Sequence, residues 1–341
     1  MFFNRKTVSI TSLFVLLILT IIDCRFSVPA TTNLESNFFL EGLLSPRGLT
    51  TLDDGTVLIA EAGAGRLLKS SLNKQSTVVL DNLPSLTKGP DGLPVGISSA
   101  LFVDDEFVFV IGEARAKGFR EIYRTTFGTD PAGLTGQDPI GINPPNPLTN
   151  PYDLVALPPK DFLITDPGAN NVWKVTREGQ LTLYAVIPPI YLAQEDMYVQ
   201  SVPTGITLGP DDAFYVVTLT GFPFPNGSAQ IIRIKDINDD GDAQDEGELV
   251  TFATGFTSLT DLTFHPDGGI LMTQFSNDLK WLSENAYITP ESFPGKLLHY
   301  KNGHTKVLAY DLVSPTSVTV LENYVLVSEE FKGRIRIIPL D

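Results

Sequence analysis

The densest group of possible metal ligands in the sequence is an acidic loop, Asp236-Ile237-Asn238-Asp239-Asp240-Gly241-Asp242. Oxygen-bearing side chains stand at positions 1, 3 and 5, and a glycine at position 6 permits the sharp turn that a calcium loop needs. The first half matches an EF-hand loop, but position 12 is Gly247 instead of glutamate. We predict a structural Ca²⁺ site here; the alternative is an acidic, solvated turn without metal. The predicted ligands are Asp236, Asn238, Asp240, Asp242 and Asp245.

The segments around this loop read as strands, and they belong to a larger repeat that must position any site. A strand–turn–strand pattern occurs six times, and successive copies start 48 to 57 residues apart. A period of this size indicates a repeated supersecondary unit, and small antiparallel sheets around an axis form a β-propeller. We therefore predict an all-β, six-bladed β-propeller with four-stranded antiparallel blades over residues 31–341. The copies start at Ser45, Leu93, Asn150, Val202, Ser258 and Ser314.

Both ends of the repeat region suggest how the ring closes. The last copy has only three strand patterns before Asp341, whereas residues 37–43 form a strand-like stretch with no partner in the first copy. We predict that this N-terminal strand completes the last blade, which would cover an otherwise open sheet edge. Helix is expected only in short connections, such as residues 189–197.

Residues 1–30 have the pattern of a leader. Arg5 and Lys6 precede an apolar run over residues 10–22, which is the charge order of a secretory signal peptide. The alternatives are an uncleaved N-terminal anchor or lipidation at Cys24, the single cysteine. The leader predicts a secreted or periplasmic protein, and one cysteine allows no internal disulfide. The net charge of −16 argues against binding to nucleic acid, or to a membrane beyond a possible anchor.

A second candidate site appears when the six copies are compared at one point. The second strand of each copy ends in a polar residue, and equivalent positions in a propeller lie at equivalent radii, so these side chains should surround one end of the central channel. They are Glu61, Glu113, Asp166, Thr218, Gln274 and Glu329. The starts of the inner strands reach the same end and add Arg47, Asp153, Thr204 and Asp261. We predict a polar cup for a metal or a small polar ligand; the alternative is that these groups cap blade ends.

Aromatic residues could add to that cup, whereas groups for nucleophilic catalysis are scarce. Phe222 and Phe224 alternate with prolines after the inner strands of the fourth copy, and they would either stack on a planar ligand or pack between blades. The three histidines, His265, His299 and His304, fall in turns or a short strand. The sequence contains no nucleophile elbow, phosphate loop or dinucleotide fingerprint.

Several motifs resemble the ScyD/ScyE family of exported propeller proteins, which is named for biosynthesis of the cyanobacterial pigment scytonemin. The similarity covers residues 37–341 and is most specific in the run Thr220-Gly221-Phe222-Pro223-Phe224-Pro225; the Pro-x-Gly strand starts also occur in NHL-repeat propellers. It further includes Pro46-Arg47-Gly48-Leu49, Ile59-Ala60-Glu61-Ala62-Gly63, Val202-Pro203-Thr204-Gly205-Ile206 and Gly227. The resemblance implies an extracytoplasmic propeller with a role in maturing an aromatic secondary metabolite.

Three functions stay open at this point. The leading hypothesis is a binding or scaffold protein without enzyme activity, for a small-molecule ligand or an exported partner. The first alternative is a metal-dependent hydrolase or lactonase with an ion in the central funnel, where the metal would activate a water molecule. The second is a quinone-dependent dehydrogenase, since the Asp236 loop is similar to acidic turns of sugar-dehydrogenase-like propellers.

Overall fold

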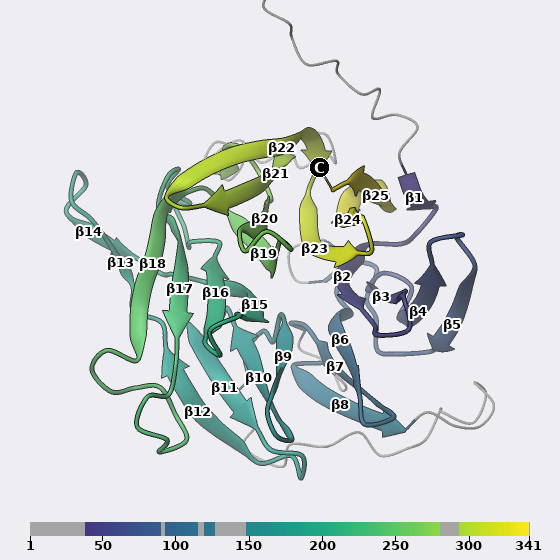
Figure 1. Cartoon of the computed structure of the whole chain (residues 1–341), viewed down its shortest axis with the longest axis horizontal. Coiled ribbons are helices and arrows are strands. Elements are labelled where there is room, and N and C mark those ends of the chain that lie inside the picture. The colour runs from purple at the N-terminus through teal and green to yellow at the C-terminus, as the bar shows by residue number, and fades with distance from the viewer. Residues whose placement is uncertain (1–37, 90–92, 115–118, 127–147, 280–292, 341) are drawn as a thin grey trace, which may run out of the picture. The chain divides into compact units, whose positions relative to one another are not determined.

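The computed structural model describes residues 38–89, 93–114, 119–126, 148–279 and 293–340. Within them, six small antiparallel sheets are arranged in a ring (Figure 1), which confirms the predicted six-bladed β-propeller. The predicted leader, residues 1–30, lies outside the described residues. Among the described residues, no helix is both long enough and apolar enough to span a membrane.

Each blade is built from consecutive strands that begin at the channel. The first blade holds β2 (Pro46–Thr51), β3 (Thr56–Glu61), β4 (Arg66–Ser71) and β5 (Ser76–Leu80). The second has three described strands, β6 (Ile97–Val103), β7 (Glu106–Ile111) and β8 (Glu121–Thr126). The third holds β9 (Leu154–Leu157), β10 (Asp161–Asp166), β11 (Asn171–Val175) and β12 (Leu181–Val186).

The remaining blades follow the same order. The fourth holds β15 (Pro203–Leu208), β16 (Phe214–Thr218), β17 (Ala229–Ile234) and β18 (Leu249–Phe256). The fifth holds β19 (Leu259–Phe264), β20 (Ile270–Gln274), β21 (Pro294–Lys301) and β22 (His304–Val313). The sixth holds β23 (Pro315–Leu321), β24 (Tyr324–Glu329) and β25 (Arg334–Pro339), with the 3-10 turn η4 (Glu330–Lys332) between the last two.

The ring is closed by the N-terminal strand, as predicted. Strand β1 (Phe38–Glu41) pairs antiparallel with β25, with Leu40 opposite Ile335. Phe39 is fully buried in an apolar cluster that also contains Leu49 and Val57 of the first blade. The two ends of the propeller therefore meet in one sheet, and the side chain of the added strand packs against the neighbouring blade.

Apolar side chains between neighbouring blades make the core. Within the part of the chain that the structure describes, six buried clusters occur, one at each contact between adjacent blades. In the contact between blades one and two, for example, Leu58 packs with Ile97 and Phe107. The second strands contribute to the clusters on both sides, which explains why residues 57–61 of β3 are all buried. These wedges of apolar residues hold each inner strand at the channel.

The connection between blades three and four differs from the expectation of a short helix at residues 189–197. It forms a hairpin of β13 (Ile190–Leu192) and β14 (Met197–Val199). The prediction was wrong because both flanks of the turn consist of strand-forming residues that pair across it. Tyr191 lies opposite Tyr198, with ring centroids 5.0 Å apart.

Removing the Phe39 side chain tests the closure. Phe39→Ala should lower the free energy of unfolding by about 3–5 kcal/mol, because a fully buried aromatic ring leaves a cavity. Leu44→Ala is the control, since the Leu44 side chain is 59% exposed, and it should change stability by less than about 0.5 kcal/mol. Urea unfolding measures both, and equal midpoints for Phe39→Ala and the unsubstituted protein would contradict the closure.

Candidate functional site

In every blade, a short segment at the start of the inner strand lies beside the channel. We number the residues of each segment from its first residue. The segments begin at Pro46, Ile97, Pro151, Pro203, Leu259 and Pro315. In five of them the pairing with the second strand shifts just after the first residue, which is a β-bulge. A bulge removes residues from the ladder and re-aims their side chains. In these five blades the second residue has no partner in the ladder. The second and third residues of all six segments lie between the channel and the next blade; we call these twelve residues the inner belt.

At the second position of the belt, hydroxyl groups join neighbouring blades. Thr204 Oγ1 donates to the carbonyl of Leu259 at 3.0 Å, and Thr260 Oγ1 donates to that of Pro315 at 2.8 Å. Ser98 and Thr316 make the corresponding, longer bonds to Pro151 and Pro46. The predicted ligand-binding residue Thr204 is buried and takes part in this ring of bonds instead.

At the third position, side-chain oxygens accept the backbone N–H of the fourth residue in the next blade. Asp153 Oδ2 accepts from Ile206 at 2.9 Å, and Asp261 Oδ2 accepts from Val318 at 2.8 Å. Ser317 Oγ does the same for Leu49 at 3.0 Å. Two carboxylates and one neutral hydroxyl therefore perform the same structural task around the ring.

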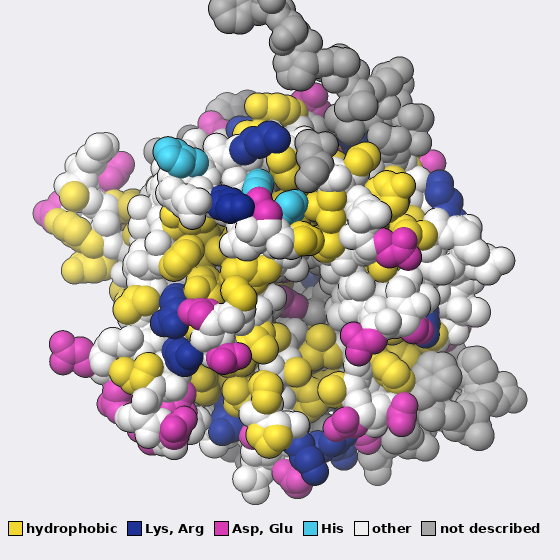
Figure 2. All heavy atoms as spheres, viewed as in Figure 1, with side chains coloured by type: hydrophobic (Ala, Val, Ile, Leu, Met, Phe, Trp, Pro, Cys, Tyr) yellow, Lys and Arg dark blue, Asp and Glu magenta, His cyan; other side chains and the backbone are white. Residues whose placement is uncertain are grey.

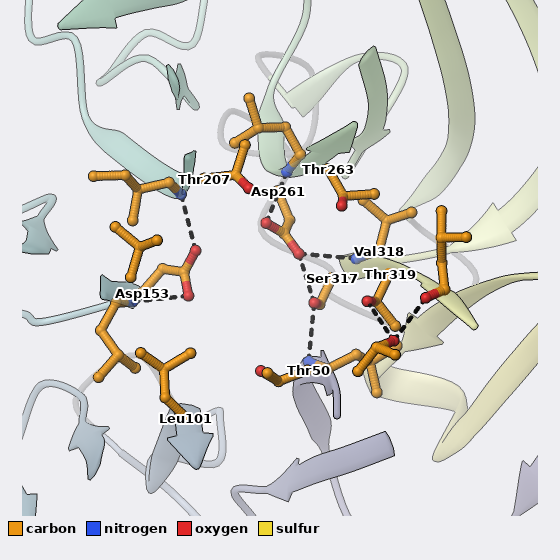
Figure 3. Close-up of a pocket in the computed structure, with 16 residues that line it drawn as sticks. Thr50, Leu101, Asp153, Thr207, Asp261, Thr263, Ser317, Val318 and Thr319 are labelled. Carbon is orange, nitrogen blue, oxygen red and sulfur yellow. Dashed lines mark hydrogen bonds between the residues drawn. The ribbon is translucent and has the colours of Figure 1, made fainter. Parts of the chain in front are cut away.

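The two acids also face a cavity of about 290 Å³ at the channel mouth, lined by residues from all six blades. Figure 3 shows Asp153 and Asp261 along this cavity, in the third and fifth blades, with the Asp261 carboxylate bonded to Ser317 and Val318. Figure 2 shows the hollow at the centre of the ring. Gly205 takes the third position in the blade between them, where a Cβ would lie 2.6 Å from Asp261 Oδ1. The rest of the lining mixes apolar side chains with hydroxyls, including Thr50, Thr207, Thr263 and Thr319.

The environment of the acid pair favours the protonated form. Burial raises the pKa of Asp153 to about 6, although the N–H groups of Ile206 and Leu154 and the Ser99 hydroxyl partly oppose this. Burial raises the pKa of Asp261 well above its ordinary value, and the nearby charge of Asp153 raises it further. The pair therefore keeps a proton at pH values where solvated carboxyl groups have lost theirs, and it can both donate and accept hydrogen bonds.

Arg47 and Tyr152 hold the second positions that have neither serine nor threonine. Arg47 Nε donates to Glu330 Oε1 at 2.9 Å, and another guanidinium nitrogen donates to the carbonyl of Pro94 at 3.0 Å. Ser45 Oγ donates to the same Glu330 oxygen at 2.7 Å. Arg47, which was predicted to bind a ligand, is thus paired with Glu330. Comparing the six copies at one position did not identify Glu330, although it directly follows Glu329, which that comparison did identify.

Three predicted cup acids, Glu61, Asp166 and Glu329, are fully buried and have other partners. Glu61 accepts the N–H of Leu44 and pairs with Arg66. Asp166 accepts the N–H groups of Thr149 and Asn150, and Glu329 accepts that of Val313 and pairs with Arg334. Each acid ties the end of its second strand to the segment before its own inner strand, so the structure gives them the capping role that was the alternative to the cup.

The other residues of the proposed cup are also separate from the acid pair. Thr218 Oγ1 accepts the N–H of Gln230, and Gln274 donates to Asn277 Oδ1 at 2.9 Å. Glu113 lies 3.5 Å from Arg120. These groups come from the ends of the second strands, which pair with the first residues of the inner segments. The Asp153 cavity is lined by later residues of the inner segments and by none of these groups.

The predicted aromatic residues lie at that same far end, after β16. Phe222 is 71% exposed, and its ring meets that of Phe224 edge to face at 6.1 Å. Phe222 therefore does not pack between blades, and neither ring lines the acid-pair cavity.

The acidic loop joins the outer strands β17 and β18, as the sequence indicated. Asn238 donates to Asp245 Oδ2 at 2.7 Å and to Asp240 Oδ2 at 3.2 Å. The N–H of Gly241 donates to Asp236 Oδ2 at 2.9 Å, while Asp236 Oδ1 is buried without a hydrogen-bond partner. The loop thus gathers oxygens from residues predicted to bind Ca²⁺, and its occupation by the ion stays a prediction.

Solved structures similar to this chain are propellers of several activities. A gluconolactonase from Xanthomonas campestris has 14% identity and a TM-score of 0.56, with 89% of this chain and 88% of that one covered. A PQQ-bound aldose sugar dehydrogenase from Streptomyces coelicolor has 12% identity and a TM-score of 0.57, covering 89% and 96%. A catalytically inactive virginiamycin B lyase from Staphylococcus aureus with quinupristin has 19% identity and a TM-score of 0.51, covering 89% and 98%.

These similarities establish the fold alone, because the sequence identities are low. No protein-family model matches the sequence. No curated protein matches it at a significant level. The chain is therefore a six-bladed propeller similar in fold to proteins of the gluconolactonase and virginiamycin B lyase type.

The raised pKa of Asp153 predicts a particular pH dependence. The unfolded chain loses this proton near pH 4 and the folded protein near pH 6, so the acid lowers stability progressively as the pH rises between these values. Relative to the unsubstituted protein, Asp153→Asn should therefore gain up to about 3 kcal/mol between pH 4 and pH 7. Urea unfolding across this range measures the difference. Asp53→Asn, in an exposed turn, is the control; a pH-independent difference for Asp153→Asn would contradict the raised pKa.

Proposed function

We propose that the protein is an exported binding module that holds a small polar molecule at the channel mouth, between Asp153 and Asp261. One observation carries this proposal: Ser317 makes the same bond to the next blade as the two acids do, but with a neutral hydroxyl. The contact between the sixth and first blades therefore uses no carboxylate as its acceptor, while the Ser317 hydroxyl itself donates to Asp261 Oδ2 at 2.5 Å.

Placing carboxylates there has an energetic cost. Burial disfavours their charged form, as the raised pKa values of both acids reflect. A pair of buried, perturbed acids facing a cavity is typical of functional sites. We infer that the pair serves a ligand, with the bonds to the next blade fixing the direction of each carboxyl group.

The lining indicates the chemistry of that ligand. The cavity is near the small end of the range for ligand pockets, and its hydroxyls alternate with apolar surface from residues such as Leu101 and Val318. An anion would be repelled by an ionised acid, whereas hydroxyl or ammonium groups would donate hydrogen bonds to it. The expected ligand is therefore small, uncharged or cationic, and rich in hydrogen-bond donors.

The predicted leader and the acidic surface support a role outside the cytoplasm. The resemblance to ScyD/ScyE proteins supports an aromatic secondary metabolite, or a protein that matures one, as the partner. The exposed Phe222 ring offers a stacking surface at the far end of the ring, where such a partner could contact the module without entering the acid-pair cavity.

A metal-dependent hydrolase is the alternative function suggested by the similarity in fold to a gluconolactonase. The oxygens of Glu61, Asp166 and Glu329 already accept backbone N–H groups or pair with arginines, so these residues do not suit a catalytic ion. Among the described residues, no three His, Cys, Asp or Glu side chains converge in the channel. We therefore derive no hydrolytic step.

Titration with three probes tests the binding proposal: glucose as a polyol, tyramine as an ammonium compound and gluconate as an anion. By calorimetry, the polyol or the amine should bind once per chain and gluconate should not. Asp261→Asn should weaken that binding at least tenfold, because the amide replaces one accepting carboxyl oxygen with an NH₂ group that can only donate. Asp53→Asn should have no effect.

Binding of gluconate alone, or equal affinity in Asp261→Asn, would contradict the proposal. Incubation with glucono-δ-lactone and divalent metal ions tests the alternative in parallel. Turnover that disappears in Glu61→Gln and Asp166→Asn would favour the hydrolase, and a quinone-dependent enzyme would show an added absorbance band after reconstitution with the cofactor.

We also propose that the acidic loop binds one structural Ca²⁺, because six acidic side chains between residues 236 and 246 repel one another without a cation. Elemental mass spectrometry of purified protein should find about one calcium per chain, and Asp240→Asn should lose it. Removal of the ion with a chelator should lower the melting temperature of the unsubstituted protein. An identical calcium content in Asp240→Asn would exclude this loop as the site.

A further inference from the structure

A separate cluster of metal-binding side chains lies in the fifth blade. The turn between β19 and β20 contributes His265 and Asp267, and the neighbouring strand β21 contributes His299. One ligand atom from each side chain lies within 4.8 Å of the other two. In Figure 2, the histidine side chains (cyan) gather over this blade, apart from the central hollow.

The distances are short enough for one metal ion to contact all three ligand atoms. Asp267 Oδ1 lies 2.8 Å from His265 Nδ1 and 3.3 Å from His299 Nε2. For ligands bound about 2.0–2.1 Å from a tetrahedral Zn²⁺, such atoms are roughly 3.3 Å apart. The spacing between Asp267 and His299 therefore matches that around a single ion, and the Asp267–His265 spacing would have to widen slightly.

The hydrogen bonds around the three ligand atoms leave one of them without a partner. The backbone N–H of Asp267 donates to His265 Nδ1 at 3.1 Å, so this nitrogen presents a lone pair. The carboxylate oxygen lies 2.8 Å from the same nitrogen, and this contact is an ion pair when the imidazole carries a proton on Nδ1; a metal cation can take the place of that proton. His299 Nε2 is buried and makes no hydrogen bond. A cation among the three atoms would satisfy all of them, replacing the weak bond at Nδ1.

Neighbouring groups hold the cluster in place. Lys301 Nζ lies 3.0 Å from Asp267 Oδ2 and donates to the Asp267 carbonyl at 2.8 Å, which leaves Oδ1 directed at the histidines. The N–H of Gly269 donates to Oδ1 at 2.8 Å. A Cβ at Gly269 would collide with the His299 ring, so the glycine provides the space that the ring occupies.

We propose that His265, Asp267 and His299 form a binding site for a divalent transition-metal ion such as Zn²⁺. Two imidazoles and one carboxylate are ligands that zinc and its neighbours in the first transition row prefer. The exposed position of the turn leaves a fourth place for water. The ion would fasten the β19–β20 turn to β21, and the positive charge of Lys301 would moderate its affinity.

Titration of the full chain, purified without a histidine tag, with ZnCl₂ and with CoCl₂ tests the site. We expect one equivalent of zinc to bind, and cobalt to give the visible absorption bands of a site with nitrogen ligands. His299→Ala and Asp267→Asn should each weaken zinc binding at least tenfold. His304→Ala is the matched control, since this exposed histidine lies in the same blade and its loss should leave binding unchanged.

The acidic loop requires its own control, because carboxylates also bind zinc. Asp240→Asn should retain the zinc equivalent that His299→Ala loses. Equal zinc affinity in His299→Ala and the unsubstituted protein would overturn the proposal, as would the absence of a cobalt spectrum. If His299→Ala unfolds, Gly269→Ala, which displaces the ring, gives a second test: unchanged binding there would also overturn the site.

Discussion

The ring depends on hydrogen bonds that pass from each inner strand to the next blade. In five of the six blades a β-bulge leaves the second residue of the inner segment out of the ladder. Side chains at the second and third positions reach backbone groups across the blade boundary. Because these bonds connect different sheets, they fix the position of each blade around the axis. The apolar clusters between blades supply most of the stabilisation. Strand β1 adds the last link by joining the two ends of the propeller.

The candidate site follows from a variation in this belt. Most belt positions use small or hydroxyl-bearing residues, which link blades at little cost in desolvation. Asp153 and Asp261 make equivalent bonds with carboxylates and also face the cavity. The same contacts that close the ring therefore orient two perturbed acids toward a shared space, so a structural element and a binding element occupy one position.

Much of the fold could be predicted from the sequence, because repeat spacing and strand patterns are local signals. The six copies and the closing strand needed only this information. The site was harder to predict: Glu61 and Asp166 stand at equivalent positions after apolar runs, and the sequence does not show that backbone N–H groups would bind both carboxylates. The bulge beside Asp261 depends on pairing between strands, and Asp153 precedes the first strand of its blade. The cluster of His265 with His299 joins a turn to a strand more than thirty residues later.

The most direct measurement compares stability and ligand binding in Asp153→Ser and Asp261→Ser, which install the residue that the sixth blade uses at the equivalent position. If the acids serve a ligand, both variants should unfold at the same urea concentration as the unsubstituted protein or higher, and should lose affinity for the polyol or amine probe. Variants that unfold much more easily and yet bind the probe unchanged would show that the acids only close the ring, and would contradict the account.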